Sequence, residues 1–172
     1  MSETAHRQEN PLEAGLSPRR TPDPCALVIF GASGDLTHKK LMPALYSLAF
    51  RHLLPPRFAI VGVARTEGDD DSWRAEMQQA VQQHGRDEFR QDVWDELAAT
   101  MHYVATDFAD VGGEGALEKL VEQCDKENQL GGNCVYYLAV PPPAFPTIVR
   151  ALGERRSTTG WTRLIVEKPF GH

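Results

Sequence analysis

The chain of 172 residues has a net charge of −6, with 41% hydrophobic and 24% charged residues. These values are ordinary for one globular domain with or without a tail, and the negative charge argues against a nucleic-acid partner. The sequence has no apolar run long enough to cross a membrane and no apolar core of a secretory signal, so we expect no membrane association.

Residues 1–24 differ in character from the rest of the chain. They are polar, contain four prolines and show no sustained hydrophobic period. Such a segment buries too little surface to offset the entropy lost on ordering. We therefore predict a disordered N-terminal tail over residues 1–24.

Apolar, strand-like runs alternate with helical patterns from residue 25 onward. The runs predict strands over residues 25–32, 57–65, 102–108, 134–140 and 163–169. The helical patterns cover residues 34–50, 72–84, 86–101, 115–128 and 144–156. Pro43 lies inside the first helix and is expected to kink it.

This alternation predicts an α/β fold, a doubly wound Rossmann-like parallel sheet in a three-layer α/β/α arrangement over residues 25–172. The expected strand order is 3-2-1-4-5, with a ligand crevice at the carboxyl ends of the first and fourth strands. That order would bring together the segments that follow each strand: residues 31–36, Arg65, Thr106 and Asp107, residues 140–145, and Lys168.

The stretch GASGDL joins the first strand to the first helix. Gly31 suits a tight turn, and Gly34 allows a pyrophosphate to approach the backbone at the start of a helix. Ser33 adds a hydroxyl donor, while Leu36 occupies the position of the third glycine in the usual fingerprint. Two glycines alone leave open an ordinary turn that binds no ligand.

Arg65 follows the second strand, where an NAD-binding domain usually has an acidic residue for the ribose 2′-hydroxyl. A guanidinium there suits a 2′-phosphate and favours NADP over NAD, although Glu67 lies close by. A solvated surface arginine is the alternative. Lys168, at the mouth of the fifth strand in VEKPFG, would bind a hydroxyl or phosphate of a substrate, unless it is an ordinary surface lysine.

Several other polar residues carry weaker indications. The run Asp69–Asp71 consists of residues of the type that bind metal ions, but a solvated loop that caps a helix is the favoured interpretation. No metal site is therefore predicted. His38 is expected to be exposed or near the phosphates. The three cysteines lack metal-site spacing, and we expect them to be reduced and buried, as in a cytoplasmic protein: Cys25, Cys124 and Cys134.

Four motifs in order, FGASGDLTHKKLMPALYSL, VGVAR, YYLAVPP and GWTRLIVEKPFG, resemble the N-terminal coenzyme domain of the bacterial glucose-6-phosphate dehydrogenase family over about residues 25–172. Leu36 then follows the family pattern, whereas Phe145 replaces a tyrosine of some members. The resemblance implies NADP binding with Arg65 at the 2′-phosphate, Thr106 and Asp107 near the adenosine, and Pro141 and Pro142 near the nicotinamide. Lys168 would touch both coenzyme and sugar phosphate. The glycine-turn contacts would come from Gly31, Ala32, Ser33, Gly34, Asp35, Leu36, Thr37 and His38.

The resemblance also implies a parent reaction, the oxidation of glucose 6-phosphate by NADP to 6-phosphogluconolactone at the start of the pentose phosphate pathway. The family's catalytic histidine lies in a later RIDHYLGKE-type segment, which this sequence lacks, so no catalytic residue is expected here. We expect an isolated coenzyme domain without the C-terminal domain that makes the parent a homodimer or homotetramer. The alternatives are a non-catalytic coenzyme-binding module, or another NADP-dependent sugar dehydrogenase with a Glu-Lys-Pro motif.

Overall fold

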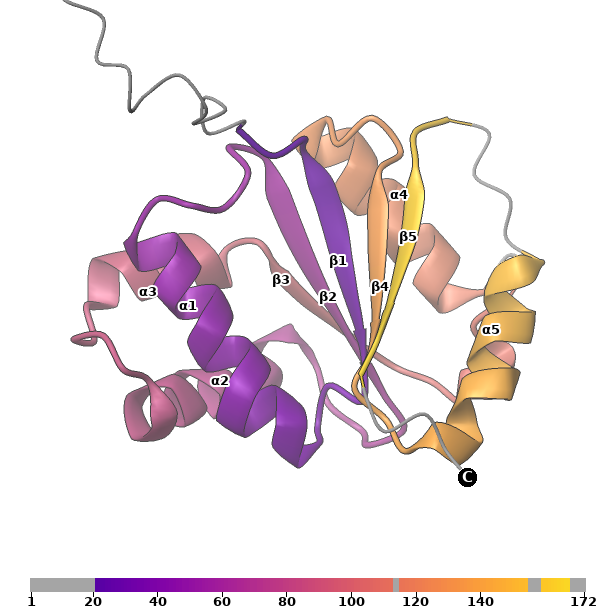
Figure 1. The fold of residues 1–172 in the computed structure, drawn as a ribbon, viewed down its shortest axis with the longest axis horizontal. Helices are drawn as coiled ribbons and strands as arrows, with labels where there is room; N and C mark the ends of the chain where they lie inside the picture. Colours follow the sequence, from indigo (N-terminus) through magenta and orange to yellow (C-terminus); the bar gives the residue numbers. More distant parts are fainter. Residues whose placement is uncertain (1–20, 113–114, 155–158, 168–172) are drawn as a thin grey trace, which may run out of the picture.

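A five-stranded parallel sheet in the order β3-β2-β1-β4-β5 forms the centre of the molecule (Figure 1). The computed structural model describes residues 21–112, 115–154 and 159–167. The strands are β1 Cys25–Phe30, β2 Phe58–Ala64, β3 Met101–Ala105, β4 Cys134–Leu138 and β5 Thr162–Val166. All four neighbouring pairs are parallel, so the expected fold class and strand order are confirmed.

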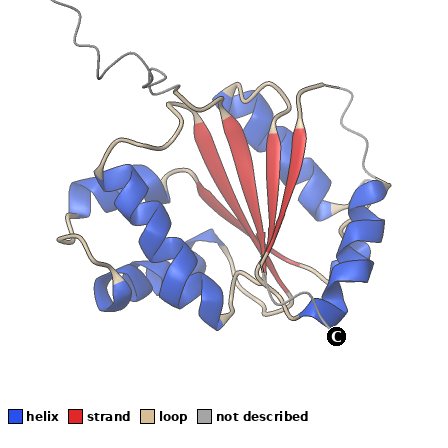
Figure 2. Ribbon diagram, viewed as in Figure 1, coloured by secondary structure: helices blue, strands red, loops and turns tan. Residues whose placement is uncertain are grey.

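Helices cover both faces of the sheet, as Figure 2 shows. On one face lie α1 Met42–Phe50, α2 Asp70–His84 and α3 Gln91–Ala98; on the other lie α4 Ala116–Asn128 and α5 Phe145–Gly153. Short helical turns precede α1, α4 and α5: η1 Thr37–Leu41, η2 Phe108–Asp110 and η3 Pro142–Ala144. The result is the expected three-layer arrangement.

The central strands are continuously apolar because each of their faces contributes to a separate core. Successive residues of a strand point to opposite faces. Phe30 accordingly packs in the cluster with Leu117 and Ile148 of α4 and α5. Ile29 packs in the other cluster, with Tyr46 of α1 and Trp73 of α2. All seven residues of β2 are buried, as expected for a strand covered on both sides.

Pro43 disturbs the first helix by a wide turn immediately before it. The backbone N–H of Met42 donates to the carbonyl oxygen of Thr37, five residues back, which defines the π-helical turn η1. Proline has no N–H with which to continue the ordinary i to i−4 ladder. Pro43 therefore lies in the first turn of α1, where its missing donor does no harm.

The expected helix over residues 86–101 is shorter in the structure, since α3 begins only at Gln91. Tyr46 explains the difference. Its hydroxyl donates to the carbonyl oxygen of Glu88 at 3.1 Å and accepts from the backbone N–H of Arg90 at 2.7 Å. In addition, the Asp87 carboxylate accepts from Ser47 and Arg51 of α1. These contacts hold the segment before α3 as a loop against α1.

The three cysteines are buried free thiols, as expected. Burial raises the pKa of the Cys124 thiol to about 11, so this group packs as a neutral side chain. Of the expected tail, residues 1–20 lie outside the described residues. Asp23 and Pro24 contact the fold, accepting hydrogen bonds from Trp161 and Asn133 respectively. None of the described helices is long and apolar enough to cross a lipid bilayer.

Candidate functional site

The carboxyl ends of the strands lie in register at one edge of the sheet. Phe30, the last residue of β1, pairs with Val63 of β2 and Leu138 of β4. Val63 in turn pairs with Val104 of β3, and Leu138 with Val166 of β5. The segments that follow these strands therefore converge at the bottom of the view in Figure 1, where the predicted site residues were expected to meet.

Gly31 starts the turn after β1 and is fixed by its surroundings. Its φ is +88°, a conformation that favours glycine. Its N–H and that of Ala32 both donate to the carbonyl oxygen of Val63, at 2.9 and 3.1 Å. A Cβ at Gly31 would lie 2.2 Å from the carbonyl oxygen of Ala139. The tight turn expected from the sequence is present, and Ala139, the residue after β4, leaves no room for a side chain at Gly31.

The rest of the turn leads into the helix with exposed Ser33 and Asp35 side chains. The N–H of Gly34 donates to the carbonyl oxygen of Gly31 at 3.0 Å. The Ser33 hydroxyl lies 3.2 Å from the hydroxyl of Thr66, which follows Arg65. The first N–H groups of a helix have no partner within the helix, so this turn presents donors suited to an anion.

Thr37 and His38, both expected at the coenzyme, make contacts that hold the turn itself. Thr37 is fully buried, and its hydroxyl donates to the carbonyl oxygen of Gly31 at 2.9 Å. The ring of His38 bridges the carbonyl oxygen of Gly34, at 2.7 Å, and a carboxylate oxygen of Glu76 on α2, at 2.5 Å. Half-buried Leu36 lies between the turn and η1.

Gly62 supports the turn from below, and the sequence analysis did not single it out. A Cβ there would lie 2.6 Å from the Trp73 ring and 2.9 Å from the Cβ of Ala32. Trp73 also donates from its indole N–H to the carbonyl oxygen of Ala32 at 3.1 Å. A glycine inside an otherwise apolar strand was the available signal, because it marks close approach of neighbouring groups.

Arg65 follows β2 as an exposed side chain. Its guanidinium carbon lies 5.9 Å from the centre of the Phe108 ring. Among the described residues, no carboxylate forms an ion pair with Arg65, and this includes Glu67, two residues later in the chain. A cavity of about 220 Å³ lies beside the turn and is lined by residues including Ser33, Thr66 and Glu67. Arg65 thus lies next to the glycine turn, and no carboxylate of the described ranges compensates its charge.

The loops after β3 and β4 complete this edge of the sheet. The N–H of Thr106 donates to the carbonyl oxygen of Ala64 at 2.9 Å, and the exposed Asp107 caps η2 through the N–H of Ala109 at 2.9 Å. Pro141 precedes η3, whose first residue is Pro142. Phe145 begins α5 and packs against the core cluster on that face.

Lys168 lies outside the described residues, but its neighbour Glu167 is described. The hydroxyl of Tyr137 on β4 donates a hydrogen bond to the Glu167 carboxylate. Burial, followed by the hydrogen bond and charge of Glu167, raises the pKa of Tyr137 well above its ordinary value. Tyr137 therefore holds the end of β5 as a neutral phenol.

A large basic groove of about 920 Å³ lies along η1 and α1. Lys39 and Arg51 in its lining are paired with Asp35 and Asp87. The other charged and titratable lining residues are Lys40, His84, Arg86 and Glu167. Lys40 and Arg86 form no ion pair within the part of the chain that the structure describes. No local pattern singles out Lys40, since the groove depends on how α1 and α2 pack.

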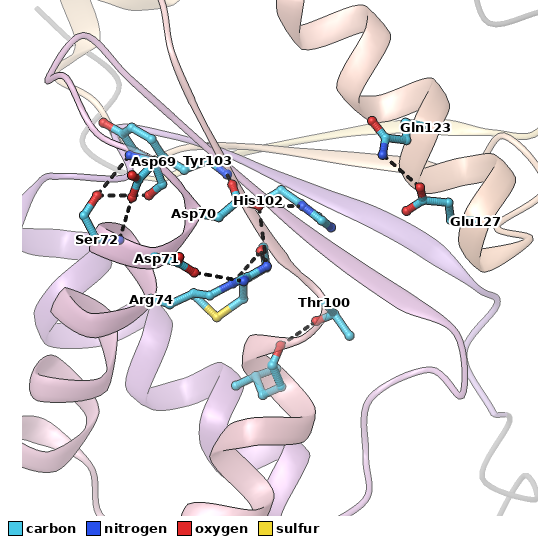
Figure 3. A network of polar contacts seen from close by, with 12 residues as sticks. Asp69, Asp70, Asp71, Ser72, Arg74, Thr100, His102, Tyr103, Gln123 and Glu127 are labelled. Atoms are coloured by element: carbon cyan, nitrogen blue, oxygen red, sulfur yellow. Dashed lines mark hydrogen bonds and ion pairs between the residues drawn. The ribbon is translucent and has the colours of Figure 1, made fainter.

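The aspartate run 69–71 is a cap, as favoured from the sequence (Figure 3). Asp69 and Ser72 form a reciprocal capping box at the start of α2. Asp70 accepts from the backbone N–H of Tyr103 at 2.7 Å and from His102 at 3.0 Å, so it covers the outer edge of β3. Across the described ranges, no group of three His, Cys, Asp or Glu side chains is placed to hold a metal ion.

A doubly wound sheet with a glycine turn entering a helix at its switch point defines a dinucleotide-binding domain. Residues 28–172 match the family model described as glucose-6-phosphate dehydrogenase, NAD binding domain. The chain belongs to this family. The resemblance inferred from the four motifs is therefore confirmed, and the alternative of another NADP-dependent sugar dehydrogenase with a Glu-Lys-Pro motif is not supported.

Curated relatives agree with the family match. The chain is 43% identical over 157 residues to glucose-6-phosphate 1-dehydrogenase 2 of Mycobacterium tuberculosis, covering 89% of this chain and 30% of that protein. It is 39% identical over 164 residues to glucose-6-phosphate 1-dehydrogenase of Chlamydia pneumoniae, covering 91% and 32% respectively. The chain thus spans about a third of the length of these relatives.

Solved structures show the same relationship. A glucose-6-phosphate dehydrogenase in complex with its substrate glucose-6-phosphate superposes with a TM-score of 0.77 at 28% identity, covering 91% of this chain and 32% of that one. The glucose-6-phosphate 1-dehydrogenase of Mycobacterium avium gives a TM-score of 0.68 at 32% identity, covering 87% of this chain and 31% of that one.

Proposed function

We propose that this chain is the coenzyme domain of a glucose-6-phosphate dehydrogenase and that its coenzyme is NADP rather than NAD. The carrying observation is the Arg65 guanidinium, which forms no ion pair with any described carboxylate and lies beside a turn in which Gly31 is locked against Val63 and Ala139. An arginine that lacks a carboxylate partner is free to pair bidentately with a 2′-phosphate. An acidic residue in that place would instead favour the 2′-hydroxyl of NAD.

The residues at the edge of the sheet fit a dinucleotide. Gly31 and Gly34 of the turn carry no Cβ, and the turn leads into the N-terminus of a helix. The Ser33 hydroxyl, the backbone N–H of Asp35 and the other first N–H groups of the helix would hold the pyrophosphate, with Thr37 and His38 supporting the turn. Thr106 and Asp107 would lie toward the adenosine, and Pro141 and Pro142 toward the nicotinamide.

The proposed substrate is glucose 6-phosphate. The basic groove is suited to the phosphate, because its Lys40 and Arg86 form no ion pair with any residue that the structure describes. The groove also reaches Glu167, the residue before Lys168. When bound, NADP would accept a hydride from the sugar. The residues of this chain would bind and orient both partners, and none of them is assigned as the base that takes the sugar proton.

The chain alone is therefore proposed to bind NADP without oxidising glucose 6-phosphate. NADPH formation by the purified chain, with glucose 6-phosphate and free of full-length enzyme, would contradict this. We also propose that the parent enzyme is a homodimer or homotetramer and is located in the cytoplasm. Size-exclusion chromatography of the parent enzyme would test its oligomeric state.

Calorimetry with NADP and NAD tests the coenzyme assignment. Arg65→Ala should weaken NADP binding by about tenfold or more, since a hydrogen bond to a charged group contributes about 1.5–3 kcal/mol. NAD affinity should not change. Arg57→Ala is the matched control, because Arg57 precedes β2 at the opposite edge of the sheet and donates to Gln129 at 2.8 Å.

Two results would count against the proposal. If NAD binds wild type as tightly as NADP and Arg65→Ala changes neither affinity, the preference for NADP is wrong. If neither coenzyme binds the folded chain, the proposal that this chain binds a coenzyme is wrong.

A further inference from the structure

We propose that His38 is a positioning residue of the coenzyme turn, whose doubly protonated ring fastens the turn to α2, so that coenzyme affinity falls when the ring loses a proton. The inference rests on the proposed function for its effect on NADP. The bridge itself is a property of the protein alone. It assigns His38 a role different from a direct contact with phosphate.

The partners of the ring determine its protonation state in this arrangement. A carbonyl oxygen, here that of Gly34 at 2.7 Å from Nδ1, accepts hydrogen bonds and cannot donate. The ionised carboxylate of Glu76, at 2.5 Å from Nε2, likewise only accepts. Both ring nitrogens must therefore carry hydrogen, whereas a neutral imidazole carries one. The bridge is complete only with an imidazolium.

The bridge matters because it fixes both polar groups of the Gly34 residue. The Gly34 N–H already donates to the carbonyl oxygen of Gly31 at 3.0 Å. The Gly34 carbonyl oxygen accepts from the His38 ring and, at 3.2 Å, from the His38 backbone N–H. The turn is thereby held in one orientation against α2. Its neighbouring backbone N–H groups are already ordered, so that binding of the coenzyme costs no further entropy for ordering them.

The surrounding charges give the pH effect its sign. Glu67 of the loop after β2, Glu76 of α2 and Tyr103 of β3 line the cavity of about 220 Å³ beside Ser33. Burial, followed by the charge of Glu76, raises the pKa of Tyr103, so this phenol is neutral. On the segment of His38 itself, Asp35 and Lys39 compensate each other at 3.1 Å.

Loss of the ring proton would therefore remove the positive partner of Glu76 and leave two carboxylates beside the turn. One of the two acceptors, the Gly34 carbonyl oxygen or the Glu76 carboxylate, would then also face a ring nitrogen that carries a lone pair instead of a hydrogen. Both changes disfavour an anionic pyrophosphate. NADP affinity is thus expected to be higher with the doubly protonated ring than with the neutral ring.

The affinity test compares wild type, His38→Lys and His38→Gln between about pH 6 and pH 8.5. The lysine keeps a positive charge and several donors across this range, and the glutamine has no charge at any pH. Wild type should bind NADP like the lysine variant at the low end, and about threefold more weakly than it at the high end. The glutamine variant should remain about threefold weaker than the lysine variant throughout.

The phosphates of NADP titrate equally in all three proteins, so ratios of affinities isolate the contribution of residue 38. His52→Asn is the matched control: His52 lies far from the turn in sequence, and its positive φ of 53° suits asparagine. It should follow the wild-type profile. If wild type and His38→Lys keep a constant affinity ratio over the whole range, the proposal is overturned.

Nitrogen-15 NMR of the imidazole rings provides a readout without coenzyme. In the free chain at about pH 6, both ring nitrogens of His38 should be protonated, and Glu76→Gln should shift the Nε2 resonance. A neutral His38 ring under these conditions would overturn the bridge. If instead NADP binds no variant while the ring is doubly protonated, the proposed function fails and the bridge stands. The NMR result also decides the matter if His38→Gln does not fold.

Discussion

The hydroxyl of Thr37 donates a hydrogen bond to the carbonyl oxygen of Gly31 at 2.9 Å and thereby ties the first helix to the turn that precedes it. Thr37 is fully buried, and among the described residues it is the one polar side chain in the buried core. Its own carbonyl oxygen accepts from Met42 in the π-helical turn. The same residue therefore anchors the proposed coenzyme turn and the irregular turn that accommodates Pro43.

Replacing Thr37 by valine should lower the free energy of unfolding by about 0.5–1.5 kcal/mol, because the carbonyl of Gly31 loses its side-chain donor at nearly constant side-chain shape and keeps only the N–H of Gly34. Urea denaturation measures the change. Thr37→Ser is the control, since it loses about one buried methyl group but keeps the hydroxyl. The serine variant should retain NADP affinity, and the valine variant should lose part of it. A valine variant as stable as wild type would contradict the role of this hydrogen bond.

Gly31→Ala should be far more damaging. The positive φ alone costs an L-residue about 1–2 kcal/mol, and the new Cβ would also lie 2.2 Å from a backbone oxygen that cannot easily move. We expect a loss of more than about 3 kcal/mol in the free energy of unfolding, measured by denaturant or thermal melts.

The matched control for Gly31→Ala is Gly153→Ala at the end of α5, where a Cβ meets nothing within 4 Å. This variant should be neutral or slightly stabilised, because alanine restricts the unfolded chain more than glycine does. Equal effects of the two substitutions would show that the turn tolerates a side chain.

Local patterns in the sequence were sufficient to predict the sheet. The central strands β1, β2 and β4 are continuous apolar runs because helices cover the middle of the sheet on both sides. Alternation with helices then leaves parallel pairing as the consistent arrangement. The glycine turn was predictable for the same reason, since its residues act within a few positions of one another. Gly31 and Gly34 are examples, and so is the Asp69 cap, which depends on Ser72 three residues later.

The contacts that no local pattern reveals join residues far apart in the chain. His38 meets Glu76, 38 residues away, and Tyr46 holds the loop at Arg90, 44 residues away. Neither contact follows from periodicity, because each depends on how α1 and α2 pack over the sheet. That is why His38 was expected to be exposed or near the phosphates rather than to form a bridge, and why the helix expected from residue 86 begins later.

The cap of α2 should make stability depend on pH in the acid range. Hydrogen bonds from the backbone N–H and then the hydroxyl of Ser72 hold the pKa of Asp69 below its ordinary value. A depressed pKa in the folded state gives stability that is present above the unfolded value of about 3.9 and lost as pH falls through the lower folded value.

Asp69→Asn keeps a capping oxygen but does not titrate, so its free energy of unfolding should vary less than that of wild type between about pH 5 and pH 2. Urea melts across this range provide the measurement. Asp71→Asn removes a charge from the same turn without touching the cap, and serves as control. If the free energy of unfolding varies with pH in the same way for wild type and Asp69→Asn, ionisation of Asp69 does not contribute to the acid dependence of stability.

Tyr137 should produce the opposite dependence at alkaline pH. Burial, then the hydrogen bond to Glu167 and its charge, raise the pKa of this phenol above the ordinary value. The resulting stability is fully present below the unfolded value of about 10 and is lost as pH rises toward the folded value, because the unfolded chain releases its proton first. Tyr137→Phe should therefore lose less stability than wild type between about pH 9 and pH 11.

Glu167→Gln separates the contribution of the carboxylate from that of burial. Without the negative charge, Tyr137 should ionise at lower pH than in wild type, which the ultraviolet absorbance of tyrosinate reports directly. Burial persists in this variant, so the pKa should remain above that of an exposed tyrosine. If the alkaline titration of Tyr137 is the same with glutamate or glutamine at position 167, the contact does not fix the end of β5, and the basic groove beside Lys40 has no defined wall on that side.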